Sequence, residues 1–170
     1  RIQRYIEVLE QKSMRLKTLT EDVVEASKIT SGNIKLECMK LDFTELVLQT
    51  SAEYEEKFEE RNLTEIQHLP KEKALVYIDG RRTWRILANL YNNAAKYAMT
   101  GSRIYTDLKV TEGAVIFSIK NISEQPLNIN ADQLTERFIR GDISRSTEGS
   151  GLGLSIAQTL TEMQKGKFEL

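Results

Sequence analysis

The chain has 170 residues, 40% of them hydrophobic, and its 24 basic and 25 acidic residues give a net charge of −1. This length allows one globular domain plus an extended element, and the interleaved charges argue against a nucleic-acid-binding protein. The single cysteine, Cys38, excludes an internal disulfide and a zinc site made of cysteines. No segment contains the roughly 18 consecutive apolar residues of a transmembrane helix.

A long helix is predicted between residues 2 and 29, where the chain has neither proline nor glycine. Apolar residues recur every seven positions, with a second series three positions later that Lys12 interrupts: Ile2, Leu9, Leu16 and Val23, then Tyr5, Leu19 and Ala26. A seven-residue period favours a bundle or coiled coil with a partner helix over one amphipathic helix packed on its own domain. Gly32 is expected to end this helix.

A second helix is predicted from Asp42 to about Arg61, because Asp42 can cap it and Glu45 follows at capping-box spacing. Its buried side would consist of Leu46, Tyr54 and Phe58. Residues 63–69 then predict an outer strand closed by Pro70. The only histidine, His68, lies in this strand. It is expected to be a partly exposed side chain rather than a catalytic one, because no pattern of acidic or hydroxyl partners surrounds it in the sequence.

Residues 74–78 predict a buried strand, and Asp79 is expected to cap the central helix. One stripe of this helix should face the core: Trp84, Leu87, Ala88, Tyr91, Ala95 and Ala98. On the opposite side lie Asn89, Asn93 and Lys96, at positions i, i+4 and i+7.

Two carboxamides and an ammonium offer neutral oxygen ligands for a hard cation and a positive charge for phosphate oxygens. This combination suits a magnesium nucleotide, whereas the alternative is an ordinary solvated face. Ile86 and Leu90 flank the polar residues and favour a partly enclosed cleft.

A hairpin is predicted beyond the turn at residues 100–102, with strands at 103–110 and 114–120 joined by residues 111–113. The helices that Asp42 and Asp79 begin can cover one face of these strands. The predicted fold is therefore a two-layer α/β sandwich, a mixed sheet covered by helices on one face, preceded by the long helix.

Residues 121–150 carry no strong periodic pattern, although 131–138 can form a short helix. The stretch ends in a glycine-rich sequence, with Gly149, Gly151 and Gly153 at alternate positions, that leads into a helix closed by Gly166. Glycines at a helix N-terminus let backbone N–H groups approach an anion, although a flexible hinge would have the same composition. Residues 167–170 predict the beginning of a strand, so we expect the chain to be part of a longer protein.

In combination, these motifs resemble the catalytic region of sensor histidine kinases, whose GHKL ATP-binding fold is shared with DNA gyrase, the heat-shock chaperone of ninety kilodaltons and MutL. Residues 89–97 resemble the family's N box, Glu136-Arg137-Phe138 its F box, and residues 149–154 its second glycine box. Residues 26–32 resemble the end of the second dimerisation helix. The order and spacing of the four matches make the resemblance specific.

The resemblance implies that this chain binds ATP and Mg2+. It implies Asn93 as the magnesium ligand, Asn89 beside it on the triphosphate side, and Lys96 on phosphate oxygens. Tyr97 would flank the adenine or ribose, and Asn121 would stand where the family has an adenine-binding Asp.

The same resemblance assigns the glycine-rich segment to a lid over the phosphates. The backbone at Gly149, Gly151 and Gly153 would wrap the phosphates, with Leu152 and Leu154 packed into the core. Arg140 and Arg145 are further candidates for phosphate contacts.

The sequence departs from the family in two places. The first glycine box reads Asn121-Ile122-Ser123-Glu124-Gln125, without the usual Asp and glycines, as in some vancomycin-resistance-type sensors. The amide oxygen of Asn121 can still accept a hydrogen bond, so altered adenine affinity is expected. No histidine followed by an acidic residue is present, so the chain cannot supply the phosphoacceptor itself.

We therefore expect residues 1–32 to be the second helix of a dimerisation stalk and residues 33–170 to be an ATP-binding catalytic domain. The resemblance implies a protein-histidine kinase that forms a homodimer through its stalk and passes the phosphate to an Asp of a response regulator. The domain would be cytoplasmic and the intact protein anchored in a bacterial membrane. The alternatives are a pseudokinase that relays signals without binding ATP, and a related ATPase or anti-sigma-type protein kinase.

Overall fold

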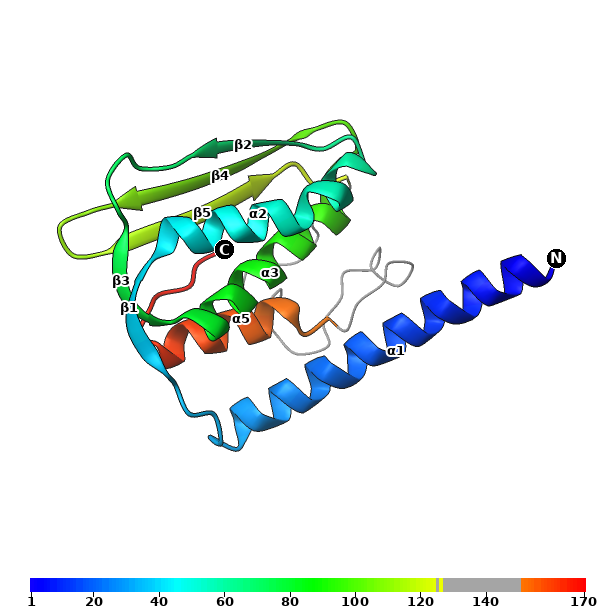
Figure 1. The fold of residues 1–170 in the computed structure, drawn as a ribbon, viewed down its shortest axis with the longest axis horizontal. Coiled ribbons are helices and arrows are strands. Elements are labelled where there is room, and N and C mark those ends of the chain that lie inside the picture. Colours follow the sequence, from blue (N-terminus) through cyan, green and yellow to red (C-terminus); the bar gives the residue numbers. More distant parts are fainter. Residues whose placement is uncertain (125, 127–150) are drawn as a thin grey trace.

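The computed structural model describes residues 1–124, 126 and 151–170 (Figure 1). The described elements, in chain order, are α1 (Ile2–Thr30), β1 (Cys38–Asp42), α2 (Phe43–Glu59), β2 (Thr64–His68), β3 (Leu75–Asp79), α3 (Gly80–Tyr97), β4 (Arg103–Val110), β5 (Val115–Asn121) and α5 (Gly153–Met163).

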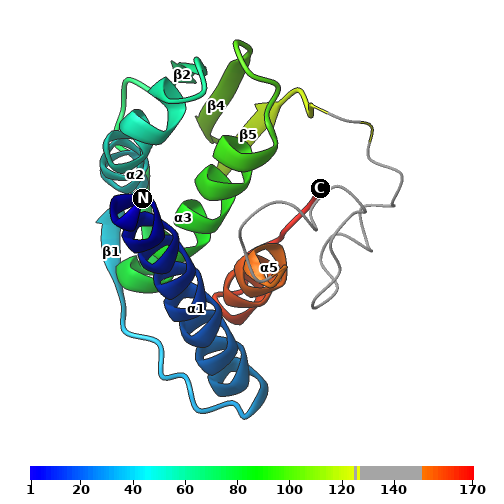
Figure 2. The same ribbon diagram turned by 90° about the vertical axis from the view of Figure 1, so that its right-hand side faces the viewer.

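Strands β2, β4 and β5 form a mixed sheet in that order, with β2 parallel and β5 antiparallel to β4. Helices α2 and α3 cover one face of it, as Figures 1 and 2 show. The predicted two-layer sandwich is confirmed, including the outer position of β2 in the described sheet. Residues 167–170, predicted to begin a strand, do not pair with any described strand.

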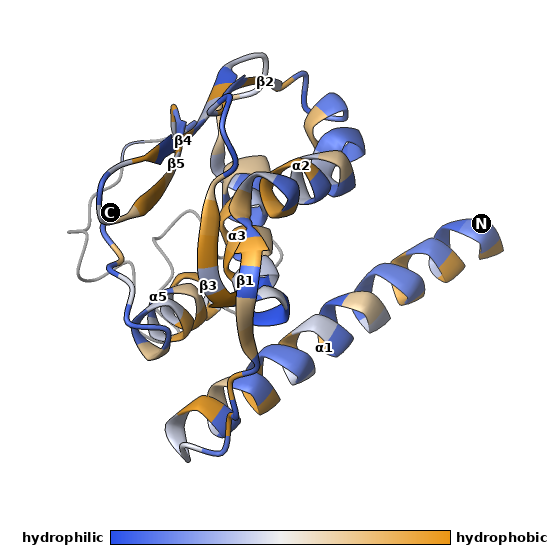
Figure 3. Cartoon of the chain, turned by 60° about the vertical axis from the view of Figure 1, so that its left-hand side comes forward, coloured by the Kyte–Doolittle hydropathy of each residue, from blue (hydrophilic) through white to orange (hydrophobic). Residues whose placement is uncertain are grey.

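The second sheet, β1 with β3, was not predicted. The two strands run antiparallel, with Cys38 opposite Asp79 and Asp42 opposite Leu75. The prediction that β3 is a buried strand was wrong, since the side chain of Tyr77 is 72% exposed. This two-stranded sheet lies at the edge of the domain in Figure 1 and faces the viewer in Figure 3, and only part of each strand is buried.

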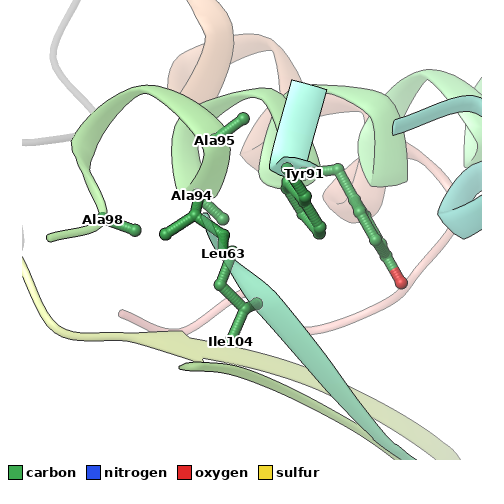
Figure 4. Close-up of a cluster of buried hydrophobic side chains, with 7 residues drawn as sticks. Leu63, Tyr91, Ala94, Ala95, Ala98 and Ile104 are labelled. Carbon is green, nitrogen blue, oxygen red and sulfur yellow. The ribbon is translucent and has the colours of Figure 1, made fainter. Parts of the chain in front are cut away.

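The core lies where α2 and α3 meet the sheet, and Figure 4 shows its central cluster. The cluster consists of Phe58, Leu63, Tyr91, Ala94, Ala95, Ala98 and Ile104. The predicted apolar stripe of α3 is confirmed except at Trp84, which is half-buried and donates from Nε1 to Glu53 Oε2 at 2.9 Å. The buried side of α2 includes Val47 and Thr50, which were not predicted, beside Phe58.

A carboxylate and its hydroxyl donors lie inside the domain. Glu65 Oε1 accepts from Tyr91 at 2.7 Å and from Thr106 at 2.8 Å, and Oε2 accepts from Ser51 at 2.6 Å. Burial, and then the hydrogen bond to Glu65, raises the pKa of Tyr91. The two residues of β2 that face α2, Glu65 and Gln67, are polar. Each is hydrogen-bonded, as polar groups away from water require: Gln67 Nε2 donates to Ser51 Oγ at 2.8 Å.

His68 is an exposed residue of its strand, as predicted, but it has an acidic partner that the sequence did not indicate. Its Nδ1 lies 2.7 Å from Asp107 Oδ1, because the parallel register places the two residues opposite each other on β2 and β4. A pair separated by 39 residues leaves no local pattern in the sequence.

The first part of α1 extends away from the domain (Figure 1), and its apolar residues are exposed, with Ile2 75%, Leu9 67% and Leu16 65% accessible. Gly32, with φ +68, ends the helix as predicted. None of the helices in the described part of the chain has the length and apolar character needed to cross a bilayer.

The last turns of α1 contact the domain. Arg85 of α3 donates from Nη2 to Asp22 Oδ1 at 2.5 Å and from Nε to Glu25 Oε2 at 2.7 Å. Burial alone would lower the pKa of Arg85, but Glu25 and Asp22 together raise it above its ordinary value. The α1 helix is thus tied to α3, which carries the predicted polar residues Asn89, Asn93 and Lys96, called the polar wall below.

Candidate functional site

Both ends of α3 are fixed, beginning with its N-terminus at Asp79. Asp79 Oδ1 accepts from Arg82 N at 3.0 Å, as the predicted cap should, and Oδ2 accepts from Glu37 N at 2.8 Å. The backbone N–H of Asp79 donates to Gln164 Oε1, beyond the end of α5, at 2.8 Å. The start of α3 is therefore held against the end of α5.

The predicted wall lies where α3 faces the N-terminus of α5. Asn89 is only 7% exposed, and Asn93 and Lys96 are half-buried. A Cβ placed on Gly153 would lie 3.5 Å from Asn89 Oδ1, so the glycine segment reaches this wall. The structure thus brings together Asn89 and Gly153, which are 64 residues apart in the sequence.

The amide nitrogen of Asn89 is buried, and no acceptor reaches it in the part of the chain that the structure describes. A buried donor without a partner costs about 1–3 kcal/mol. Such an orphaned group beside the glycine segment fits a site whose missing acceptor is a ligand oxygen.

The residues around Gly153 anchor the segment. Gly151 has φ +75, a conformation that glycine adopts without strain. Leu152 is 1% exposed and packs with Ile156 and Leu160 in a cluster that Ile86 of α3 contacts. Leu152 therefore packs into the core as predicted, whereas Leu154 is half-buried.

The other predicted side of the site is the end of β5. Asn121 is the last residue of this strand and is exposed. The chain beyond it runs beside the end of α3: Met99 N donates to Ile122 O at 2.7 Å, and Glu124 N donates to Tyr97 O at 3.0 Å. Tyr97, half-buried, thus lies next to the segment that carries the altered first glycine box.

Some predicted positions lie outside the described residues. These are Arg140, Arg145 and Gly149, with the Glu136-Arg137-Phe138 motif and the short helix predicted at 131–138. Among the residues that are described, no group of three or more His, Cys, Asp or Glu could hold a metal ion. A magnesium ion bound here would depend on amide, phosphate and water oxygens, which are ligands that it accepts.

The sequence interpretation missed Arg61, between α2 and β2. Arg61 Nη1 donates to Ala95 O at 2.7 Å and to Lys96 O at 2.6 Å, and Nη2 lies 3.2 Å from Glu124 Oε2. Its neighbours in the sequence carry no signal for these contacts, because the partners are 34 to 63 residues away.

Comparison with known proteins identifies the same region. The sequence pattern of the family described as "Histidine kinase-, DNA gyrase B-, and HSP90-like ATPase" matches residues 78–170, more than half of the chain. The chain is 30% identical over 159 residues to the sensor protein VanSC of Enterococcus gallinarum, an alignment that covers 92% of this chain and 44% of VanSC.

Solved structures show the same fold. Histidine kinase AdeS of Acinetobacter baumannii superposes with a TM-score of 0.78 at 23% identity, covering 97% of this chain and 75% of that one. Histidine kinase ThkA, solved in complex with the response regulator protein TrrA, gives a TM-score of 0.66 at 23% identity, covering 97% of this chain and 45% of that one.

The chain spans less than half the length of the sensor proteins that it matches, 39% of one and 44% of another. The family pattern nevertheless includes all of α3 and α5 and the glycine segment between them. The chain belongs to the histidine kinase-, DNA gyrase B- and HSP90-like ATPase family.

Proposed function

We propose that this chain is the ATP-binding catalytic part of a sensor histidine kinase and binds magnesium ATP between α3 and the glycine segment before α5. The observation that carries the proposal is the contact of Gly153 with Asn89, whose buried amide nitrogen has no acceptor in the described chain. The family's description as an ATPase supports ATP as the ligand.

The individual roles remain part of this proposal. Asn93 would ligate the magnesium ion through its amide oxygen, and Asn89 and Lys96 would contact the phosphates. Tyr97 would flank the adenine or ribose. When bound, the ion neutralises charge on the phosphate oxygens, as in phosphoryl transfer generally.

Further binding roles would belong to residues on either side of the proposed site. Asn121 would accept a hydrogen bond from the adenine. The lid backbone at Gly149, Gly151 and Gly153 would hold the phosphates, with Arg140 as an additional contact.

The acceptor of the γ-phosphate would be a histidine on another segment, since His68 has no acidic residue after it and pairs with Asp107. The sensor proteins among its relatives, and the ThkA complex with a response regulator, support a response regulator Asp as the next acceptor. We further propose that the intact protein is anchored in a bacterial membrane, with this domain on the cytoplasmic side.

Residues 1–32 would form the second helix of a dimerisation stalk, and residues 33–170 the ATP-binding domain. The exposed heptad positions of α1 support a homodimer through this helix, because an apolar seam of this length needs a partner. Its last turns pack on the domain instead, through Ala26 and Ile29.

Titrating the chain with a fluorescent ATP analogue, with and without magnesium, tests the proposal. Wild-type protein should show saturable, magnesium-dependent binding. Asn93→Ala should weaken binding about tenfold or more in the presence of magnesium, as loss of a charge-assisted contact does. Asn92→Ala, the same change at the next position of α3, is the matched control and should bind as wild type does.

Absence of saturable binding would contradict the proposal and favour the pseudokinase alternative. If binding is present, mixing the chain with a stalk fragment that contains the phosphoacceptor histidine and labelled ATP should give an acid-labile phosphoprotein. Phosphoserine instead of phosphohistidine would favour the anti-sigma-type kinase.

A further inference from the structure

Arg61 joins three parts of the molecule that are distant in sequence. It follows α2, its side chain is 26% exposed, and its guanidinium forms four hydrogen bonds. Two of them end on backbone carbonyls of the last turn of α3, and a third reaches the carboxylate of Glu124 beyond β5.

The contacts with α3 have a clear physical basis. The last carbonyls of a helix have no partners within it and carry the negative end of the helix dipole, which a cation stabilises. The carbonyls that Arg61 binds belong to Ala95 and Lys96, and Tyr97 follows directly. Arg61 therefore fixes the direction of the turn that carries Lys96 and Tyr97.

The contact with Glu124 fixes the segment after β5 to the end of α3. Glu124 N also donates to Tyr97 O at 3.0 Å, so side chain and backbone hold the same two segments together. The backbone of Arg61 contributes as well: its carbonyl oxygen accepts from Gly101 N at 3.1 Å, in the turn that follows α3. The planar fork of arginine can bind carbonyls and a carboxylate at once, which a lysine ammonium cannot reproduce.

We infer that Arg61 is a positioning residue of the nucleotide site, which sets the adenine side of the site relative to the phosphate side. This inference rests on the proposed function. Arg61 lies outside the segment matched by the family pattern, and its side chain acts through the backbone of α3 and through Glu124.

The test compares ATP with inorganic tripolyphosphate, which needs the phosphate side alone. Arg61→Gln and Arg61→Lys should each weaken ATP binding about tenfold. They should weaken tripolyphosphate binding only about threefold, through Lys96, the phosphate-side residue on the same turn. Glu124→Gln, at a side chain that is 56% exposed, keeps the α3 contacts and should weaken ATP binding about threefold. Because Glu124 is exposed, this variant will fold even if the Arg61 variants do not.

Arg85→Gln is the matched control. Like the Arg61 variants, it removes a guanidinium with several hydrogen bonds. Arg85, however, lies in the first half of α3, and its partners are Asp22 and Glu25 of α1. It should lower the melting temperature as Arg61→Gln does and leave affinity for both ligands unchanged.

The outcomes separate the two claims. If wild-type protein binds no ATP, the proposed function fails. If wild-type protein binds ATP but the Arg61 and Glu124 variants bind it equally well, or lose ATP and tripolyphosphate affinity in parallel, the positioning role of Arg61 is overturned.

Discussion

The Tyr91 hydroxyl links the acidity of one side chain to the stability of the fold. Tyr91 is fully buried, and burial, followed by its hydrogen bond to Glu65, raises the pKa of its phenol. The unfolded chain loses this proton near its ordinary pKa of about 10, whereas the folded chain keeps it. The free energy of unfolding should therefore be unaffected by this group below about pH 9 and fall as the pH rises through about 10. Urea denaturation at several pH values measures this.

Tyr91→Phe separates the stabilising hydrogen bond of the hydroxyl from its effect on the pH dependence of stability. Near neutral pH it should cost about 1 kcal/mol, because Glu65 keeps Ser51 and Thr106 as donors. In the alkaline range the variant should lose stability less steeply than the wild type, although Tyr54, whose pKa burial also raises, keeps part of the slope. Tyr77→Phe, at an exposed position, is the control for loss of a tyrosine hydroxyl. An unchanged slope in Tyr91→Phe would contradict the assignment.

Two glycines beside the site should respond differently to alanine. Gly151 has φ +75, so Gly151→Ala should cost about 1–2 kcal/mol of stability. Among the described residues, the atoms nearest to a Cβ at Gly153 belong to Asn89, at ordinary contact distance, so Gly153→Ala should leave stability unchanged or raise it by up to about 1 kcal/mol.

At Gly153, alanine should lower the affinity for nucleotide although it does not lower the stability of the fold. The added methyl group occupies space beside Asn89, whose amide nitrogen has no acceptor in the described part of the chain, so Gly153→Ala should weaken ATP binding in the fluorescence titration while the protein stays folded. If the stable Gly153→Ala protein bound ATP as tightly as the wild type, the site would not lie against this part of α5.

Among the helices and strands, those with a strong local pattern could be predicted from sequence. The heptads of α1, the stripe of α3 and the hairpin of β4 and β5 each depend on residues close together in the chain. Strand β1 could not be predicted, because the strand that it pairs with, β3, follows only after all of α2 and β2. The same limit hid the contacts of Glu65 and Gln67 on β2, because both side chains pair with Ser51 of α2, 14 and 16 residues away.

The candidate site shows the same division. Asn89, Asn93, Lys96 and the glycines could be found because they form short motifs with fixed spacing. Arg61, which binds the last turn of α3, could not be found, because its partners there are 34 and 35 residues away. Long-range polar contacts depend on the packing of elements, which local patterns do not encode.

Asp79 determines where α3 begins, and its removal tests how far the helix depends on its cap. Asp79→Ala loses the acceptor for Arg82 N and leaves Glu37 N without its partner, so we expect a loss of about 2–3 kcal/mol. Asp79→Asn keeps one acceptor oxygen and should lose less. Urea midpoints at constant m-value measure both, and a loss below about 0.5 kcal/mol in Asp79→Ala would show that packing alone fixes this end of α3.

Across the molecule, the question is what holds α1 against the ATP-binding domain. Apolar contacts contribute, since Ala26 and Ile29 pack on the cluster around Leu152. Figure 2 shows α1 beside α5 at this point. The ionic part depends on Arg85, which binds both Asp22, 6% exposed, and Glu25. Removing one partner of a partly buried ion pair leaves uncompensated charges, here two neighbouring carboxylates.

Arg85→Gln should therefore loosen the last turns of α1 without disturbing the core of α3. Hydrogen exchange should speed up in residues 20–30 and stay unchanged in the buried stretch 87–95. Arg82→Gln, whose guanidinium lies 3.9 Å from Glu25, should have a smaller effect. Because partly buried charges are only weakly screened, raising the salt concentration should not reproduce the Arg85 variant in wild-type protein. Equal exchange in Arg85→Gln and wild type would mean that the apolar cluster alone holds α1 in place.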